Sequence, residues 1–333
     1  MGTLTSERSS ELQSIVWDSS SLEVAVMIEA ELTKVVDDGR GTIRDIGLHS
    51  LNAGGKRVRP LLVWYSGLMF GAPSEALKRT AVAVELIHMA SLIHDDVIDG
   101  SELRRNRPTA QKNWGCHRAV LGGDFFFAKA FGVLAETGLV KTLEIMAQAV
   151  QEMCRGEILQ AADQFNTGVS LERYYERITK KTAVLLEASC KAGALVAGAP
   201  ESEAETIGRF GLNLGLAFQI TDDILDLCGD EAKMGKAKYA DLTKGNITLP
   251  LALLLKEEGY RDWINTVIKE REFNRAQLER IESTLRESGA IERAFAIGAA
   301  HLEEARKILS GFADSSQRRF LSDLTYMLQA RAN

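Results

Sequence analysis

The sequence has few residues that interrupt helices, because only five of its 333 residues are proline. Long proline-free stretches such as residues 171–199 leave room for helices of many turns. Apolar residues recur at helical steps almost throughout, with no alternating strand pattern and no Asn-Gly or Asp-Gly turn between alternating segments. The pattern predicts an all-α single domain over residues 1–333, with a flexible segment over residues 1–20 and roughly ten or more helices.

Other absences limit the function. No run of about 18 apolar residues is present, so no membrane span is expected. The net charge of −6 gives no basic face for a nucleic acid. The four cysteines lie far apart and form no CxxC pair, so a zinc site is not expected and a reduced, cytoplasmic compartment fits. The N-terminus also lacks the apolar segment of a secretory signal.

Glycine and proline mark several predicted helix boundaries. Gly54 and Gly55 predict the end of one helix, and Pro60 is expected as the first residue of the next. Near the C-terminus, two amphipathic stretches meet at Gly289, which we expect to be a hinge between helices.

Two acidic motifs each follow an apolar run: "LIHDDVID" at residues 92–99 and "ITDDILD" at residues 220–226. On a helix through the first motif, His88, Asp95 and Asp99 fall within about 20° of one line. One such motif is more often a solvated face, but two attached to apolar helices indicate carboxylates that bind metal. Oxygen ligands of this kind suit Mg²⁺. The six candidate ligands are Asp95, Asp96, Asp99, Asp222, Asp223 and Asp226.

A basic motif, "GGKRVRP", presents Lys56, Arg57 and Arg59 at a predicted helix start. Backbone N–H groups at a helix start attract anions, and guanidinium groups bind phosphate in a bidentate manner. Arg105, and His88 if protonated, could join them. Taken alone, the motif would more readily be interpreted as a solvated charged turn. Six carboxylates facing one cavity could balance three divalent cations and leave the cavity ready for a diphosphate.

Taken together, these motifs resemble the trans-polyprenyl diphosphate synthases. The resemblance runs from about residue 50 to 255 through "GGKRVRP", "ELIHMASLIHDDVID", "LRRNRPT", "GDFFFAKA", "KKTAVLL", "FQITDDILD" and "MGKAKYADLTKGNITLP". It is strongest with the long-chain branch, particularly the catalytic subunit of heptaprenyl diphosphate synthase. The resemblance implies a helical bundle of the isoprenoid synthase type with a central active-site cavity.

The resemblance also implies residue roles. The first motif would bind the Mg²⁺ that holds the allylic diphosphate, the second would bind further Mg²⁺, and Asp226 would be more peripheral. The isopentenyl diphosphate site would comprise Lys56, Arg59, His88 and Arg105. Allylic diphosphate contacts would come from Arg104, Lys181 and Lys236. Thr182 and Gln219 would face the developing cation, so that the expected catalytic set is Lys181, Thr182, Gln219, Asp95 and Asp222.

Three positions depart from the family pattern. The arginine pair is followed by Asn106 where glycine is usual, and Asn246 stands where "GKxTLP" would have lysine. The stretch "GKAKYAD" lacks the more usual proline and glycine, which leaves the conformation around Lys236 open.

The implied reaction is chain elongation: the allylic diphosphate ionises with the help of about three Mg²⁺ ions, and the double bond of isopentenyl diphosphate attacks the cation. A proton then leaves to the released diphosphate, which gives the lengthened allylic product. A long all-trans product of about six to ten isoprene units, with seven the best estimate, would serve a quinone side chain. A homodimer is expected, or a complex with a small second subunit, whose product could pass to a membrane. The alternatives are a short-chain farnesyl or geranylgeranyl synthase, a non-catalytic regulatory subunit, a terpene cyclase and a protein-only metal buffer.

Product length is assigned by resemblance to the residues one turn before the first motif. Ala90 and Ser91 are small, and in the family bulky residues there close the tunnel floor. Helix packing alone could also explain small residues, but the tunnel is favoured because "MAS" interrupts otherwise large apolar residues. The far end of the tunnel is left open among Phe125, Phe126, Phe127 and Phe131.

Overall fold

The computed structural model describes residues 19–37, 40–229, 238–271 and 273–331. These residues form two compact units, one within residues 1–146 and 189–204 and the other within 147–188 and 205–333. Helices provide almost all of the regular structure, so the predicted all-α class is confirmed. A single domain over the whole chain remains a prediction. Of the segment 1–20, the structure describes residues 19 and 20 alone, at the start of a helix.

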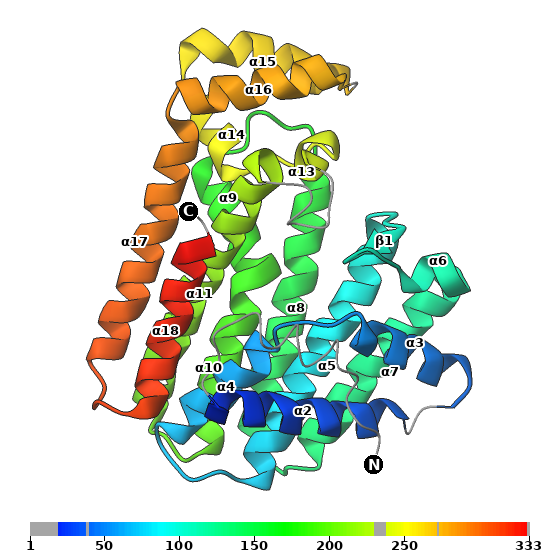
Figure 1. Ribbon diagram of the computed structural model, residues 1–333, viewed down its shortest axis with the longest axis vertical. Coiled ribbons are helices and arrows are strands. Elements are labelled where there is room, and N and C mark those ends of the chain that lie inside the picture. The colour runs from blue at the N-terminus through cyan, green and yellow to red at the C-terminus, as the bar shows by residue number, and fades with distance from the viewer. Residues whose placement is uncertain (1–18, 38–39, 230–237, 272, 332–333) are drawn as a thin grey trace. The chain divides into compact units, whose positions relative to one another are not determined.

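The first unit contains most of the N-terminal half. Its elements are α2 (Ser19–Asp37), α3 (Thr42–Asn52), α4 (Val58–Leu68), α5 (Glu75–Ile98), β1 (Leu103–Arg104), β2 (Arg107–Pro108), α6 (Ala110–Trp114) and α7 (Cys116–Ala135) (Figure 1). The predicted helix end near Gly54 is confirmed, because α3 ends at Asn52. The position of Pro60 was wrong by two residues: α4 begins at Val58, and Pro60 is its third residue.

Helix α5 carries the first acidic motif, and its sequence explains its length. Ser74 caps its N-terminus by accepting a hydrogen bond of 3.1 Å from the backbone N–H of Leu77. The helix ends at Ile98, and Gly100, with a φ of 61°, turns the chain away. Helix α7 packs against α5, and Gly123 makes this approach possible. A Cβ on Gly123 would lie 2.3 Å from Nε2 of His94.

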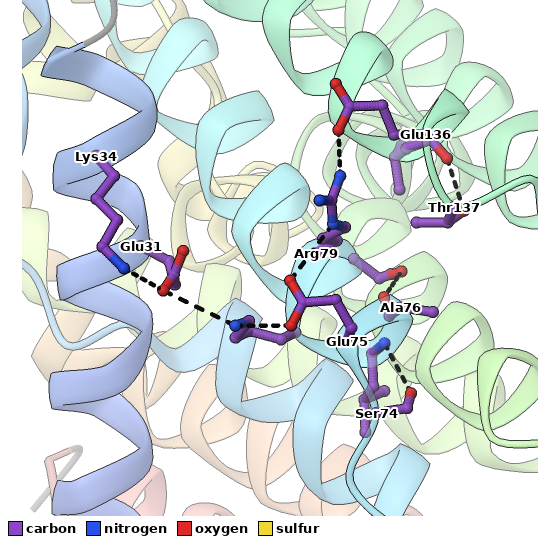
Figure 2. Close-up of polar contacts among 12 residues, drawn as sticks. Glu31, Lys34, Ser74, Glu75, Ala76, Arg79, Glu136 and Thr137 are labelled. Carbon is purple, nitrogen blue, oxygen red and sulfur yellow. Dashed lines mark hydrogen bonds and ion pairs between the residues drawn. The ribbon is translucent and has the colours of Figure 1, made fainter.

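An exposed network of alternating charges connects α2, α5 and α7 near the start of α5, as Figure 2 shows. Lys34 pairs with Glu31 at 2.8 Å, and Arg79 pairs with both Glu75 and Glu136. Exposed pairs of this kind contribute little individually and weaken with salt. The network therefore fits a solvated surface, in contrast to the charges at the other end of α5.

A two-stranded hairpin follows α5, although the sequence shows no alternating strand pattern. Strands β1 and β2 are antiparallel, with Leu103 opposite Pro108 and Arg104 opposite Arg107. Arg105 and Asn106 form the two-residue loop, with φ values of 51° and 59°. Two successive positive φ values define a type I′ turn, in which asparagine is favoured. Two-residue strands leave no alternation to detect, and Asn106 can fill the position where glycine is usual because both residues tolerate this conformation.

The second unit contains the remaining helices. They are α8 (Val140–Ala162), α9 (Leu171–Ile178), the π-helix η1 (Thr179–Ala183), α10 (Val184–Val196), α11 (Glu201–Cys228), α13 (Ala240–Thr243), α14 (Leu249–Leu254), α15 (Glu258–Glu270), α16 (Arg275–Glu287), α17 (Ala290–Ser310) and α18 (Ser316–Arg331), of which α8, α10 and α11 also include residues of the first unit. The predicted hinge is confirmed, because Gly289 has a φ of 70° between α16 and α17. Helices α17 and α18 pack side by side (orange and red in Figure 1).

The π-helix η1 interrupts an otherwise continuous helical stretch at "TKKTA". Two glycines pack directly against its backbone. A Cβ on Gly156 of α8 would lie 2.5 Å from the backbone nitrogen of Lys181, and one on Gly215 of α11 would lie 2.6 Å from the Cα of Ala183. Single-turn π-bulges are frequent at functional sites. The geometry therefore draws attention to Lys181 and Thr182, which lie within this turn.

Among the described residues, none of the helices is long and apolar enough to cross a membrane.

Candidate active site

A pocket in the first unit is lined by several of the residues predicted to bind diphosphate or its metal ions. Four of the predicted residues line it, namely His88, Asp96, Arg104 and Arg105. Lys56 is exposed just before α4, and Arg59 is half-buried in its first turn; neither contributes to this lining. The pocket lining therefore combines basic and acidic side chains, which suits a phosphate group accompanied by a cation.

Arg57 also lines this pocket, but it is committed to buried ion pairs. Its guanidinium donates to Glu29 at 2.7 Å and to Glu85 at 2.9 Å, and all three side chains are buried. Burial alone lowers the pKa of Arg57, but Glu85 and Glu29 outweigh it and raise the pKa above its ordinary value. Breaking such a pair would leave a buried charge uncompensated. Of the three basic residues in "GGKRVRP", Arg57 thus anchors the start of α4, where its φ is 49°.

Arg105 reaches back to the end of α3. Its guanidinium donates to the carbonyl oxygens of Ala53, at 3.3 Å, and of Gly54. Gly55, with a φ of 150°, passes between guanidinium groups: a Cβ there would lie 2.8 Å from Nη1 of Arg57 and 3.1 Å from Nη1 of Arg105. The two glycines read from the sequence as a helix end therefore also make room for the basic groups.

His88 does not carry the charge that the sequence allowed for it. Its ring keeps some exposure but is closely surrounded by protein. This desolvation lowers the pKa of His88 well below its ordinary value, and the positive charges of Arg59 and Arg105 lower it further. The sequence left the protonation state of His88 open, and this lowered pKa favours the neutral form.

The three aspartates of the first motif have different environments. Asp95 is half-buried on α5, and Asp99 caps the helix and is exposed. Asp96 is 5% exposed and accepts a hydrogen bond of 2.8 Å from Nε of Arg104. Arg104, predicted to contact the allylic diphosphate, thus neutralises the buried member of the motif in this structure.

The small residues assigned to product length also differ. Ala90 is fully buried in the packed core, whereas Ser91 is half-buried and donates to the carbonyl oxygen of His88 at 2.8 Å. Of the phenylalanines on α7, Phe126 is fully buried and Phe127 packs against His94. Ser91 is the better candidate, because a larger side chain at Ala90 would overpack the core.

In the second unit, a hydrogen-bonded chain connects the π-helix to the second acidic motif. The Thr182 hydroxyl donates to Oε1 of Gln219 at 2.6 Å, and Nε2 of Gln219 donates to Asp223 at 2.8 Å. The structure thus brings together Thr182, Gln219 and Asp223, which the sequence placed in the site independently. Burial and the nearby Asp241 raise the pKa of Asp223 to about 7, although donors from Gln219 and Tyr174 oppose the shift.

The other two aspartates of this motif differ in depth. Asp222 is 34% exposed and pairs with Arg331 of α18 at 3.1 Å. Asp226 is fully buried, and its Oδ2 accepts a hydrogen bond of 3.0 Å from the backbone N–H of Asp241. Its carbonyl oxygen accepts another, of 2.8 Å, from the N–H of Tyr239. Asp226 therefore connects α11 to the chain that returns to it.

The predicted lysines have different outcomes. Lys181 pairs with Glu157 of α8 at 2.6 Å. Lys236 lies outside the described residues, so the conformation around it stays open. Asn246 occupies the position of the usual second lysine. It is buried and donates a hydrogen bond of 3.0 Å to the carboxylate of Asp241. A lysine in this conformation would place an ammonium group in the interior, which explains the local fit of asparagine.

Sequence reasoning missed four residues that contact the predicted site: Tyr174, which donates to Asp223, Glu157, Arg331 and the anchoring pair partner Glu85. Each lies far from its partner in the sequence. Tyr174 stands beside a second tyrosine, Tyr175, and nothing in the local sequence distinguishes the two. Isolated Glu and Arg residues look like ordinary charged surface residues.

The carboxylates fit Mg²⁺ shared with a ligand, and not a metal enclosed by protein alone. Within the described ranges, no three His, Cys, Asp or Glu side chains are grouped closely enough to hold an ion by themselves. Asp95, Asp99 and Asp222 do offer accessible oxygen donors. Mg²⁺ usually binds through one or two carboxylates while retaining water and contacting substrate phosphates.

Comparisons with known proteins agree with this chemistry. The chain is 40% identical over 304 residues to heptaprenyl diphosphate synthase component 2 of Geobacillus stearothermophilus, covering 91% of this chain and 94% of that protein. The heptaprenyl diphosphate synthase of Staphylococcus aureus is similar in structure, with a TM-score of 0.87, 32% identity and coverage of 93% and 98% of the two chains.

A polyprenyl synthase of Caulobacter crescentus, solved with calcium and isoprenyl diphosphate, has a TM-score of 0.86, 34% identity and coverage of 94% of this chain and 96% of that one. The polyprenyl synthetase family model matches residues 41–285. The predicted family and the prenyltransferase activity are thereby confirmed. The chain belongs to the polyprenyl synthetase family.

Proposed function

We propose that this protein is a long-chain trans-prenyltransferase that adds isopentenyl diphosphate to an allylic diphosphate, such as farnesyl or geranylgeranyl diphosphate, to give a heptaprenyl product. The family match and the similarity to heptaprenyl diphosphate synthases support the activity and the product. The observation that carries the proposal is that both acidic motifs keep accessible carboxylates while their central aspartates are buried and hydrogen-bonded. This arrangement supports an oriented ligand set over two solvated surfaces.

Isopentenyl diphosphate would bind through basic residues of the first unit. Lys56, Arg59 and Arg105 would contact its phosphates, with neutral His88 donating or accepting a hydrogen bond. Arg57 would hold the start of α4 in place without contacting the substrate directly, because Glu29 and Glu85 already engage it.

The allylic diphosphate would be bound by Arg104, Lys181 and Lys236 and, through Mg²⁺, by the acidic motifs. Bound Mg²⁺ would supply Lewis-acid stabilisation to the departing diphosphate. Arg104 and Lys181 are each paired with a carboxylate, and they would shift from those partners towards the phosphate as it enters. Thr182 and Gln219 would hold polar atoms near the developing positive charge, fixed by their mutual hydrogen bond.

Two alternative functions make different predictions. A non-catalytic regulatory subunit would not need both acidic motifs, and both are complete here. A short-chain synthase would be expected to close the tunnel near Ser91. We propose a cytoplasmic enzyme that supplies a quinone side chain, acting as a homodimer or with a small second subunit; the word "component" in its relative's name supports the second possibility.

The deciding experiment is an elongation assay with isopentenyl diphosphate, farnesyl diphosphate and Mg²⁺, followed by mass analysis of the dephosphorylated products. We expect products of about seven isoprene units, no products after chelation of Mg²⁺, and elution of the purified chain at more than its monomer mass. Products of three or four units would identify a short-chain enzyme. Absence of turnover that is restored by a co-purified small protein would identify an obligate heteromer.

A substitution tests the length assignment. Ser91→Phe should shift the products towards three or four units while the first condensation persists, because the ring would occupy the half-buried position one turn before Asp95. Ala90→Phe is the contrasting variant, and we expect it mainly to lower the unfolding temperature, since Ala90 is fully buried. Unchanged long products from an active Ser91→Phe enzyme would place the tunnel elsewhere.

A further inference from the structure

The hydroxyl of Tyr174 has a specific partner in the second acidic motif. Tyr174 is fully buried on α9, and its hydroxyl donates to Oδ2 of Asp223 at 2.7 Å. Gln219 donates to the other oxygen, Oδ1, at 2.8 Å. One donor on each oxygen fixes both the position and the rotation of the carboxylate.

The ring of Tyr174 cannot easily move away from this partner. It belongs to the apolar core of the second unit, together with Ile220 and Ile224 of α11. It packs edge-to-face against Tyr175 at 5.7 Å, and the guanidinium of Arg177 lies 5.5 Å from its centre. Packing would be satisfied equally well by phenylalanine, so the hydroxyl needs a separate explanation. A buried hydroxyl without a partner would be costly.

We propose that Tyr174 is a positioning residue for the second acidic motif. With Gln219 it fixes the Asp223 carboxylate in the orientation in which Mg²⁺ and the allylic diphosphate meet it. The inference rests on the proposed function and deepens it by naming a residue one turn before the π-helix. Each carboxylate oxygen accepts one protein hydrogen bond and retains capacity for a cation. Residues that orient a metal-binding group in this way commonly change metal affinity or activity by about ten- to a hundredfold.

The geometry also explains why the network includes the π-helix. Thr182 holds the far end of Gln219 through the 2.6 Å hydrogen bond to its Oε1. The side chains of Thr182, Gln219, Asp223 and Tyr174 therefore form one continuous path from η1 back to α9. A bulge that shifted Thr182 would release Gln219, and with it one of the two donors on Asp223.

The test compares Tyr174→Phe with the matched control Tyr175→Phe, which removes a hydroxyl from the neighbouring, half-buried ring. In Tyr174→Phe, the Mg²⁺ concentration for half-maximal activity and the KM for the allylic diphosphate should rise by about tenfold. The KM for isopentenyl diphosphate should stay constant, because that substrate is assigned to the first unit. The control should resemble the wild type in all three constants.

A binding measurement gives a second readout without turnover. Mg²⁺ together with inorganic pyrophosphate should raise the unfolding temperature of the wild type and of Tyr175→Phe, and should raise that of Tyr174→Phe by clearly less at the same concentrations. Should Tyr174→Phe not fold, Thr182→Val, which releases Gln219 from its other end, must raise the same two constants.

A purely structural hydroxyl would lower the amount of active enzyme and the unfolding temperature while leaving both constants unchanged, and that result would overturn the inference. The outcomes separate it from the proposed function. A wild type without Mg²⁺-dependent elongation would contradict the function itself. An active wild type matched by Tyr174→Phe in Mg²⁺ dependence would contradict only the role of Tyr174.

Discussion

The two acidic motifs have the same spacing but different surroundings. In the first, the last aspartate, Asp99, follows the end of α5 and is exposed. In the second, the corresponding Asp226 lies within α11 and is fully buried. The central aspartates also differ: Asp96 is held by the guanidinium of Arg104, whereas Asp223 is held by the neutral donors of Tyr174 and Gln219.

This difference follows from where each helix ends. Helix α5 stops at Ile98, so its last carboxylate reaches solvent. Helix α11 continues to Cys228, and the chain returns to hydrogen-bond with Asp226 through Tyr239 and Asp241. Equal spacing in sequence therefore does not imply equal roles. Position one is accessible in both motifs, whereas position five is exposed in the first motif and buried with a backbone hydrogen bond in the second.

The largest expected effect comes from the shared first positions. Asp95→Ala and Asp222→Ala should each reduce turnover by about 10²–10³, because each removes an electrostatic element from the reaction centre. Circular dichroism should remain that of the wild type, since neither side chain is fully buried. Near-normal turnover of both variants at limiting Mg²⁺ would contradict the metal assignment.

The fifth positions should separate stability from activity. Asp226→Ala should lower the free energy of unfolding by about 1–3 kcal/mol, because the part-buried N–H of Asp241 loses its acceptor. Asp99→Ala should leave the unfolding temperature unchanged and reduce turnover instead. Calorimetry and kinetics on the two variants check this, and equal unfolding temperatures would mean that Asp226 is not the structural contact described here.

The smallest expected effect concerns the ion pair between Arg331 and Asp222 of the second motif. Arg331→Gln removes the cation beside Asp222, so Mg²⁺ should half-saturate the enzyme at a concentration about two- to fivefold lower, as befits a partly exposed pair. Arg79→Gln, which breaks exposed pairs in the network of Figure 2, is the control and should change nothing. A higher Mg²⁺ requirement in Arg331→Gln would show that Arg331 assists binding.

Local patterns predicted the helices and the motifs well. The all-α class, the end of α3 and the hinge at Gly289 followed from proline scarcity, helical periodicity and glycine placement. The hairpin was missed because two-residue strands are too short to show alternating apolar and polar residues. In addition, arginine is not a residue type that indicates a positive φ, although Arg105 has one. The π-helix was missed because the close approach of Gly156 and Gly215 to its backbone is a tertiary contact that the local sequence does not reveal.

The residue types of the site were predictable, but their environments were not. Arg57 and Arg59 are only two positions apart. Nothing in the local sequence indicates that Arg57 forms buried ion pairs with Glu29 and Glu85. The charge of His88 likewise depends on burial and on arginines brought near by folding. Such effects arise from partners distant in sequence, which periodicity and spacing do not report.

The two glycines against the π-helix have a consequence for engineering product length. A methyl group on Gly156 or Gly215 would collide with backbone atoms, which cannot rotate aside as a side chain can. In saturation libraries that vary Gly156 or Gly215, most variants would be unable to keep the backbone of Lys181 and Thr182 in its present position. Libraries that vary Ser91 and the α7 phenylalanines, with both glycines kept, would instead give variants in which the turn with Lys181 and Thr182 stays intact.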